Sequence, residues 1–287
     1  MHNNEHAPQE SASLILRNED GRPIRSIEDW LELAPPKKGI AHWQDGRSAK
    51  ELAKAWFRGP KPSPPTELTR LLASHPATQH LVIHEAAAEC RLRLDDFEGE
   101  TRNADLWLRC SNEDELVVAT IEGKADEEFG TKIGPYYDSK CGTRSNVPGR
   151  IDALCNAIFG HELSAEIRCL RYQLLHGAAA TLISARDHGA IKAVFVIHEF
   201  HSARCRHAAL MRNSADWGQF LRSLNAVPYL TETEEYLAQT DTVPFKMFGP
   251  IAVPGGGFVP SGLPLFLGYV RTNLTKPEAA DFEKRVH

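Results

Sequence analysis

The stretch LVVATIEGKADEEFG at residues 116–130 decides the fold, because its apolar run ends abruptly in charged residues. The run predicts a buried strand, and Glu122, Gly123 and Lys124 close it. Side chains alternate between the two faces of a strand, so Glu122 and Lys124 share one face and Gly123 lies on the other. The stretch therefore predicts a rigid strand that holds a carboxylate beside an ammonium group.

Two further strands are predicted before this stretch. The segment CRLRLDD alternates apolar and polar residues from Cys90 onward, and ADLWLRC does the same around Asp105. Three consecutive strands with short connections predict an antiparallel meander. The preceding segment LVIHEAAAE is ambiguous, and its alanines are compatible with a helical turn that carries Glu85 or Glu89.

Helical patterns surround these strands. Capping-box signatures at Ser26 and Ser48 predict two short helices, SIEDWLELA and SAKELAKAWF, and a third is expected at residues 67–74. After the sheet, PGRIDALCNAIFG predicts a helix, apolar spacings of three and four predict one long helix from Ser164 to about Asp187, and AIKAVFVIHEF predicts a buried strand. The order helix, three strands, helix, strand predicts an α/β fold with one central sheet.

Less regular segments complete the chain. Helices are expected near residues 216–224 and 231–239, followed by a glycine-rich loop without the Gly-Lys-Ser/Thr of a phosphate-binding P-loop, and the last strand is LFLGYVR. We therefore divide the chain into four parts. These are a flexible leader at 1–20, an N-terminal helical region at 21–80, the α/β core at 81–202, and a C-terminal α/β extension packed on the core at 203–287.

Composition narrows the function classes. The chain has 287 residues, 42% of them hydrophobic, which is enough for a sizeable core. A net charge of −5 argues against a generally basic protein that coats nucleic acid, although a local basic groove is still compatible with it. Six cysteines without a CxxC pair predict reduced thiols, and the N-terminus lacks a signal-peptide pattern. We expect a cytoplasmic protein with no membrane partner.

The charged pair needs a further carboxylate to form a metal site. Asp105 lies on the preceding strand, where cross-strand neighbours approach closely enough to share an ion. Mg²⁺ in proteins is held by one or two carboxylates plus water, and a nearby lysine can orient or deprotonate a nucleophilic water. Asp105, Glu122 and Lys124 therefore predict a metal-centred cluster. The alternative is a solvated pair of Glu122 and Lys124 at the end of a strand, which is common in proteins.

This arrangement resembles the PD-(D/E)XK nuclease superfamily, whose αβββαβ core carries an Asp and a Glu-x-Lys on two neighbouring strands. The resemblance covers roughly residues 82–200. It implies a restriction-endonuclease-like core with a central mixed sheet flanked by helices. It also implies that Asp105 and Glu122 bind Mg²⁺, with Mn²⁺ as a possible substitute, that the Gly123 carbonyl is an extra ligand, and that Lys124 assists the attacking water. Ala104 stands where the superfamily's name places a proline.

The same resemblance implies a Mg²⁺-dependent nuclease, with a DNA endonuclease as the first expectation, nucleic acid as its partner and a homodimer as one possible assembly. The alternative is an inactive nuclease-like module used for binding or regulation. Three stretches, GRSAKELAKAWF, IEGKADEEFG and RYQLLHGAAATLISA, also look like an uncharacterised bacterial family of unknown function that we associate with this superfamily. That likeness implies a shared fold and site and supplies no substrate.

Further residues are candidates for the same site. For its upstream acidic position we favour Glu89 slightly over Glu85. In the superfamily the helix after the sheet often contributes a glutamine or a basic residue, which implies Gln173 and Arg171; the alternative is that this part of the helix only packs. The segment HEFHSARCRH at residues 198–207 invites a zinc interpretation, which we disfavour because no second ligand pair accompanies it.

Overall fold

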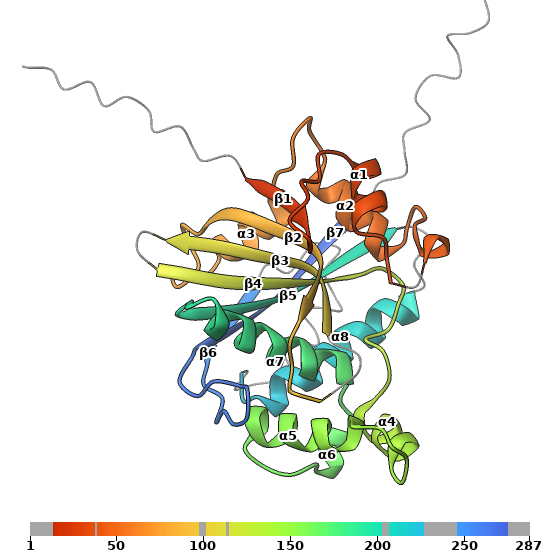
Figure 1. The fold of residues 1–287 in the computed structure, drawn as a ribbon, viewed down its shortest axis with the longest axis vertical. Helices are drawn as coiled ribbons and strands as arrows, with labels where there is room; N and C mark the ends of the chain where they lie inside the picture. Colours follow the sequence, from red (N-terminus) through yellow and green to blue (C-terminus); the bar gives the residue numbers. More distant parts are fainter. Residues whose placement is uncertain are drawn as a thin grey trace, which may run out of the picture.

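A single mixed sheet organises the structure. The computed structural model describes residues 14–37, 39–97, 102–112, 115–202, 207–226 and 246–274. Within these ranges seven strands form one sheet in the order β1-β2-β3-β4-β5-β7-β6, and helices cover both of its faces (Figure 1). The predicted α/β fold, with a central mixed sheet flanked by helices, is therefore confirmed.

The strands are β1 (Ile15–Asn18), β2 (Val82–Leu92), β3 (Arg102–Asn112), β4 (Glu115–Lys124), β5 (Lys192–Ser202), β6 (Lys246–Ile251) and β7 (Leu265–Leu274). The helices are α1 (Ile27–Leu33), the 3-10 helix η1 (Ile40–His42), α2 (Ser48–Trp56), α3 (Thr66–Ala73), α4 (Ile133–Lys140), α5 (Val147–Phe159), α6 (Ala165–Arg168), α7 (Tyr172–Asp187) and α8 (His207–Ser223).

The centre of the sheet is the antiparallel meander that the sequence predicts. β2 pairs with β3, and β3 pairs with β4 in a register that sets Leu106 opposite Ile121. β5 returns parallel to β4 after the crossover through α4 to α7, and it places Glu199 beside Lys124. β7 then adds parallel to β5, and β6 adds antiparallel to β7 at the edge. The charged end of β4 is therefore enclosed between neighbouring strands rather than exposed at an edge.

Apolar layers on both faces fix β4 in place. On one face α7 packs its buried alanines, Ala178 to Ala180, against the sheet. On the other face α2 and α3 bury Trp56 and Leu71. The residues of β4 from Val117 to Lys124 are buried between these layers, so the strand that ends in the charged pair is held from both sides.

Gly177 of α7 lies against the ring of Phe195 on β5. A Cβ at this position would lie 2.6 Å from Phe195 Cζ, which is closer than such atoms approach in folded proteins. We expect Gly177→Ala to lower the free energy of unfolding by about 1–3 kcal/mol despite the better helix propensity of alanine, because the ring must move within a packed core. Urea denaturation measures this change. A variant as stable as the wild type would show that α7 does not need this close approach.

The structure resolves one ambiguous segment and corrects one predicted helix. The segment LVIHEAAAE forms most of β2 rather than a helical turn, because it pairs with β1 on one side and β3 on the other, and the sheet buries its alanines. The long helix expected from Ser164 is interrupted between α6 and α7. The chain is extended at Arg171 because the segment after β4 pairs with it, and the Ile133 N–H donates to the Leu170 carbonyl at 2.9 Å. Both conformations depend on contacts between segments that are distant in the sequence.

Element boundaries also differ from the prediction. β1 lies in the segment expected to be a flexible leader, where it pairs in parallel with β2. Arg47, and not Ser48, occupies the N-cap of α2, and the Ser48 hydroxyl donates to the Glu127 carboxylate at 3.2 Å. α8 begins at His207, earlier than predicted, and the helix expected at 231–239 lies outside the described ranges. Of the helices that the structure describes, none is long and apolar enough to cross a membrane.

Candidate active site

Three carboxylates lie side by side across the sheet. The register sets Ala88 opposite Leu106 and Cys90 opposite Ala104, so Glu89 of β2 lies beside Asp105 of β3. Asp105 in turn accepts a hydrogen bond from the Gly123 N–H, next to Glu122 of β4. We call Glu89, Asp105 and Glu122 the carboxylate row. Lys124 adjoins Glu122 on the same face of β4, and Gln173 reaches Glu122 from the first turn of α7. The structure therefore brings together all five residues that we predicted as catalytic, although they come from four separate elements.

Glu122 is held by three donors. It is 2% exposed, and its Oε1 accepts hydrogen bonds from Lys124 Nζ at 2.6 Å and from Gln173 Nε2. Its Oε2 accepts a hydrogen bond from the guanidinium of Arg102 at the start of β3. Burial raises the pKa of Glu122, but the charges of Arg102 and Lys124 outweigh burial and hold its pKa below the ordinary value. Glu122 is therefore ionised at neutral pH.

Asp105 and Glu89 have fewer hydrogen-bond donors around them than Glu122 has. Asp105 Oδ2 accepts a hydrogen bond from the Gly123 N–H at 2.7 Å, which places Gly123, the predicted backbone ligand, next to the row. Burial, and then the charge of Glu122, raise the pKa of Asp105 to about 7. Glu89 accepts a hydrogen bond from Asn103 Nδ2 at 2.6 Å, and burial, followed by the charge of Asp105, raises its pKa to about 9. At neutral pH Glu89 therefore keeps its proton and Asp105 is partly protonated, so Glu122 is the one member of the row that carries a full negative charge.

A hard divalent cation fits the donors of the carboxylate row. Carboxylate oxygens are its preferred ligands, and its positive charge would favour the ionised forms of Asp105 and Glu89. Asp105 and Glu122, the ligands predicted from the sequence, lie on the paired strands β3 and β4, and the charge of Glu122 acts on Asp105. Among the described residues, no three His, Cys, Asp or Glu side chains are already arranged around an ion position. The Glu122 oxygens instead accept from Arg102, Lys124 and Gln173.

Two other predicted candidates lie away from the row. Glu85, the alternative to Glu89, forms an ion pair at 2.5 Å with an arginine of β1. The Arg171 guanidinium bonds to Asp216 Oδ2 and to Glu128 Oε2, both at 2.7 Å. Of the two upstream acids, Glu89 is therefore the one that lies on the row, and Arg171 links α7 to α8 and to the segment after β4.

Arg102 and Asn103 contact the row, and the sequence patterns did not predict either of them. Arg102 precedes Asp105 by three residues, which in an ideal strand places it on the opposite face. No periodicity therefore indicates that its guanidinium reaches Glu122. Asn103 carried a weak signal, because its position two residues before Asp105 gives both side chains the same face of β3.

The zinc interpretation of residues 198–207 gains no support from the part that the structure describes. His198 is fully buried, and its Nε2 lies 2.8 Å from Thr272 Oγ1. Burial lowers the pKa of His198 to about 3. Cys205 and the side chain of His207 lie outside the described residues.

The buried Glu89 carboxyl makes stability depend on pH. Between its ordinary pKa of 4.5 and about 9, folded Glu89 keeps a proton that the unfolded chain releases, so stability falls as the pH rises through this range. Glutamine does not titrate, so the free energy of unfolding of Glu89→Gln should fall less than that of the wild type between about pH 5 and about pH 9. We expect the two decreases to differ by at least about 1 kcal/mol. Urea denaturation at the two pH values measures this. Equal losses in both proteins would show that Glu89 titrates normally.

Comparison with known proteins gives one match. A family model described as "Domain of unknown function (DUF6946)" matches residues 23–274, which include every strand of the described sheet except β1. No curated protein and no solved structure matches the chain.

Proposed function

The chain belongs to the family described as a domain of unknown function (DUF6946), and we propose that it is a Mg²⁺-dependent nuclease that hydrolyses phosphodiester bonds, first of all in DNA. The observation that carries this proposal is the carboxylate row, in which three acids from neighbouring strands lie beside a fixed lysine. Such a row suits a divalent cation, and a lysine beside it suits a phosphate group or an attacking water. The resemblance to the PD-(D/E)XK superfamily supports the same reaction class.

Each residue of the site has a role in this proposal. Asp105 and Glu122 would hold Mg²⁺ or Mn²⁺, which when bound stabilises negative charge on the phosphate oxygens. Lys124 Nζ is fixed by Glu122 at 2.6 Å, so it is oriented before the substrate arrives and can donate a hydrogen bond to the attacking water. The Gln173 amide fixes the Glu122 carboxylate from α7. The water oxygen forms a bond to phosphorus and releases a proton to the solvent, and the bond from phosphorus to the leaving oxygen breaks as that oxygen takes up a proton from the solvent.

A cleavage assay tests the proposal directly. We expect the purified full-length protein to cleave DNA in the presence of Mg²⁺ or Mn²⁺ and to lose this activity in EDTA. Plasmid, duplex DNA, single-stranded DNA and RNA are compared at matched concentration on denaturing gels. If none of these substrates is cleaved with either metal ion, the proposed activity is wrong.

A second candidate function rests on the contacts of Glu122. Arg102, Lys124 and Gln173 together satisfy both of its oxygens, which is the arrangement expected if the carboxylate only stabilises the fold. This observation favours a nuclease-like module that binds or regulates without cleaving. Nucleic acid that binds without being cleaved in the same assay would favour this second function.

A further inference from the structure

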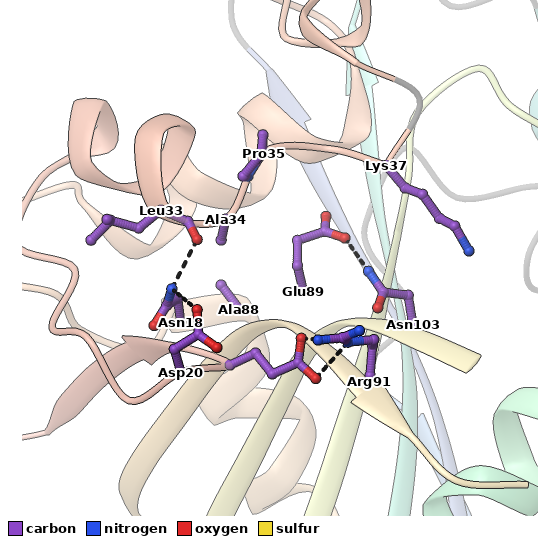
Figure 2. A pocket seen from close by; sticks show the side chains of 11 residues that line it. Asn18, Asp20, Leu33, Ala34, Pro35, Lys37, Ala88, Glu89, Arg91 and Asn103 are labelled. Atoms are coloured by element: carbon purple, nitrogen blue, oxygen red, sulfur yellow. Dashed lines mark hydrogen bonds and ion pairs between the residues drawn. The ribbon is translucent and has the colours of Figure 1, made fainter. Parts of the chain in front are cut away.

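A cavity adjoins the carboxylate row at Glu89. It has a volume of about 300 Å³ and is lined by residues of β1, the end of α1, β2 and β3. The segment from Leu33 to Pro35 lies on one side of it, and Ala88, Glu89 and Asn103 lie on the opposite side (Figure 2). A ligand in this cavity would therefore contact the carboxylate row at Glu89 and lie close to Asp105, the neighbour of Glu89 on β3.

The backbone of Glu89 is strained where it lines the cavity. Its φ angle is +50°, a left-handed conformation that is unfavourable for a residue with a side chain. Strain of this kind persists only where the surrounding structure holds it, and it concentrates at functional sites. In Figure 2 the Glu89 side chain stands between the two walls, and its carboxylate accepts the hydrogen bond from Asn103. The strained residue thus joins the cavity to the row.

Charges around the cavity disfavour a phosphate inside it. The lining contains the acids Glu19, Asp20 and Glu89 and the bases Lys37 and Arg91. Arg91 Nε is bonded to both oxygens of Glu19 at 2.7 Å, which neutralises that pair. The ionised acids and bases leave the lining without an excess of positive charge, so a neutral ligand is favoured over an anionic one.

The shape and chemistry of the walls suit a flat ligand with a polar edge. The side from Leu33 to Pro35 offers mainly apolar groups, and the opposite side offers the Asn103 amide and the Glu89 carboxyl. A nucleobase has apolar faces and an edge of donors and acceptors, and amide and carboxyl side chains are the groups that bind such edges. The volume of the cavity is sufficient for one base with its sugar.

We propose that this cavity receives one unpaired nucleobase of the strand whose phosphate lies on the carboxylate row. The inference rests on the proposed nuclease function and specifies its substrate as a strand with an unpaired or extruded base beside the reacting phosphate. A base in a fully paired duplex must first unpair and unstack, which costs energy. Single-stranded or mismatched DNA should therefore bind more tightly than a paired duplex.

A fluorescent base tests the proposal in the full-length protein. The probe is an oligonucleotide that contains 2-aminopurine, whose emission rises when it leaves the base stack, with Ca²⁺ in place of Mg²⁺ to limit cleavage. Binding is followed separately by the anisotropy of an end label. We expect 2-aminopurine emission to rise on binding, and Ala34→Leu, which fills the cavity, to remove most of this rise and weaken binding about tenfold. Ala215→Leu on the exposed side of α8 is the matched control and should behave as the wild type.

The outcomes separate this inference from the proposed function. Oligonucleotide that binds and is cleaved in Mg²⁺ without any change in 2-aminopurine emission would overturn the cavity assignment and leave the nuclease standing. A full emission rise in Ala34→Leu would also overturn it. If Ala34→Leu has a lowered melting temperature, Pro35→Leu at the exposed side of the same wall replaces it. If no nucleic acid binds at all, both proposals are wrong.

Discussion

Replacing Lys124 with methionine is expected to lower the rate of Mg²⁺-dependent phosphodiester cleavage by about 10²- to 10⁴-fold. Lys124 is 6% exposed, and Glu122 fixes its Nζ at 2.6 Å, so the ammonium group is positioned at the row before substrate binds. Methionine keeps a similar length and removes only the positive charge and its hydrogen bonds. Single-turnover cleavage of a labelled oligonucleotide with saturating protein measures the chemical step without a contribution from product release.

A lysine outside the site provides the matched control. Lys50 on α2 forms an ion pair with Asp45 at 3.0 Å, and Lys50→Met should cleave at the wild-type rate. Glu122→Gln should also lose activity, because it removes a proposed ligand of the metal ion. Cleavage that survives both Lys124→Met and Glu122→Gln would show that the activity resides elsewhere in the protein. Thermal melting of each variant distinguishes a lost catalytic group from a lost fold.

The meander and the residues on it could be predicted because strand periodicity is a local property. The alternation in β3 and the apolar run of β4 each indicate a strand without reference to the rest of the chain. Alternation also predicts that Glu122 and Lys124 share a face. Once the two strands pair as neighbours, Asp105 has to lie near that face, so the centre of the candidate site could be found from the sequence.

Features that depend on distant contacts could not be predicted in the same way. The alanines of LVIHEAAAE suit a helix, but strands on both sides impose the extended conformation on them. The helix break at Arg171 exists because the segment after β4 pairs there, which no pattern around Arg171 reveals. β1 was expected to be a flexible leader for the same reason, since a short strand is stable only when its partner is present.

Arg102 is the residue whose role depends most on tertiary structure, and its replacement should produce the largest change in stability. We expect Arg102→Met to lower the free energy of unfolding by about 3–5 kcal/mol, because it leaves Glu122 buried with one cation fewer. Mg²⁺ or Mn²⁺ should restore part of this loss if the carboxylate row binds it, because a ligand that binds only the folded state stabilises that state. Urea denaturation in EDTA and in millimolar metal ion measures both effects.

A second buried arginine, Arg150, serves as the control that distinguishes a metal-replaceable role of Arg102 from a purely structural one. Arg150 bonds to Asp95 away from the row, so Arg150→Met should also be destabilising, but metal ions should not restore its stability more than that of the wild type. If metal ions restore stability in Arg102→Met and not in Arg150→Met, a metal ion can take the place of the Arg102 guanidinium beside Glu122. This is the behaviour expected of a nuclease that binds its metal ion at the row. If neither variant responds to metal ions, Arg102 is the permanent counterion of Glu122, and the nuclease-like binding module becomes the better account of this protein.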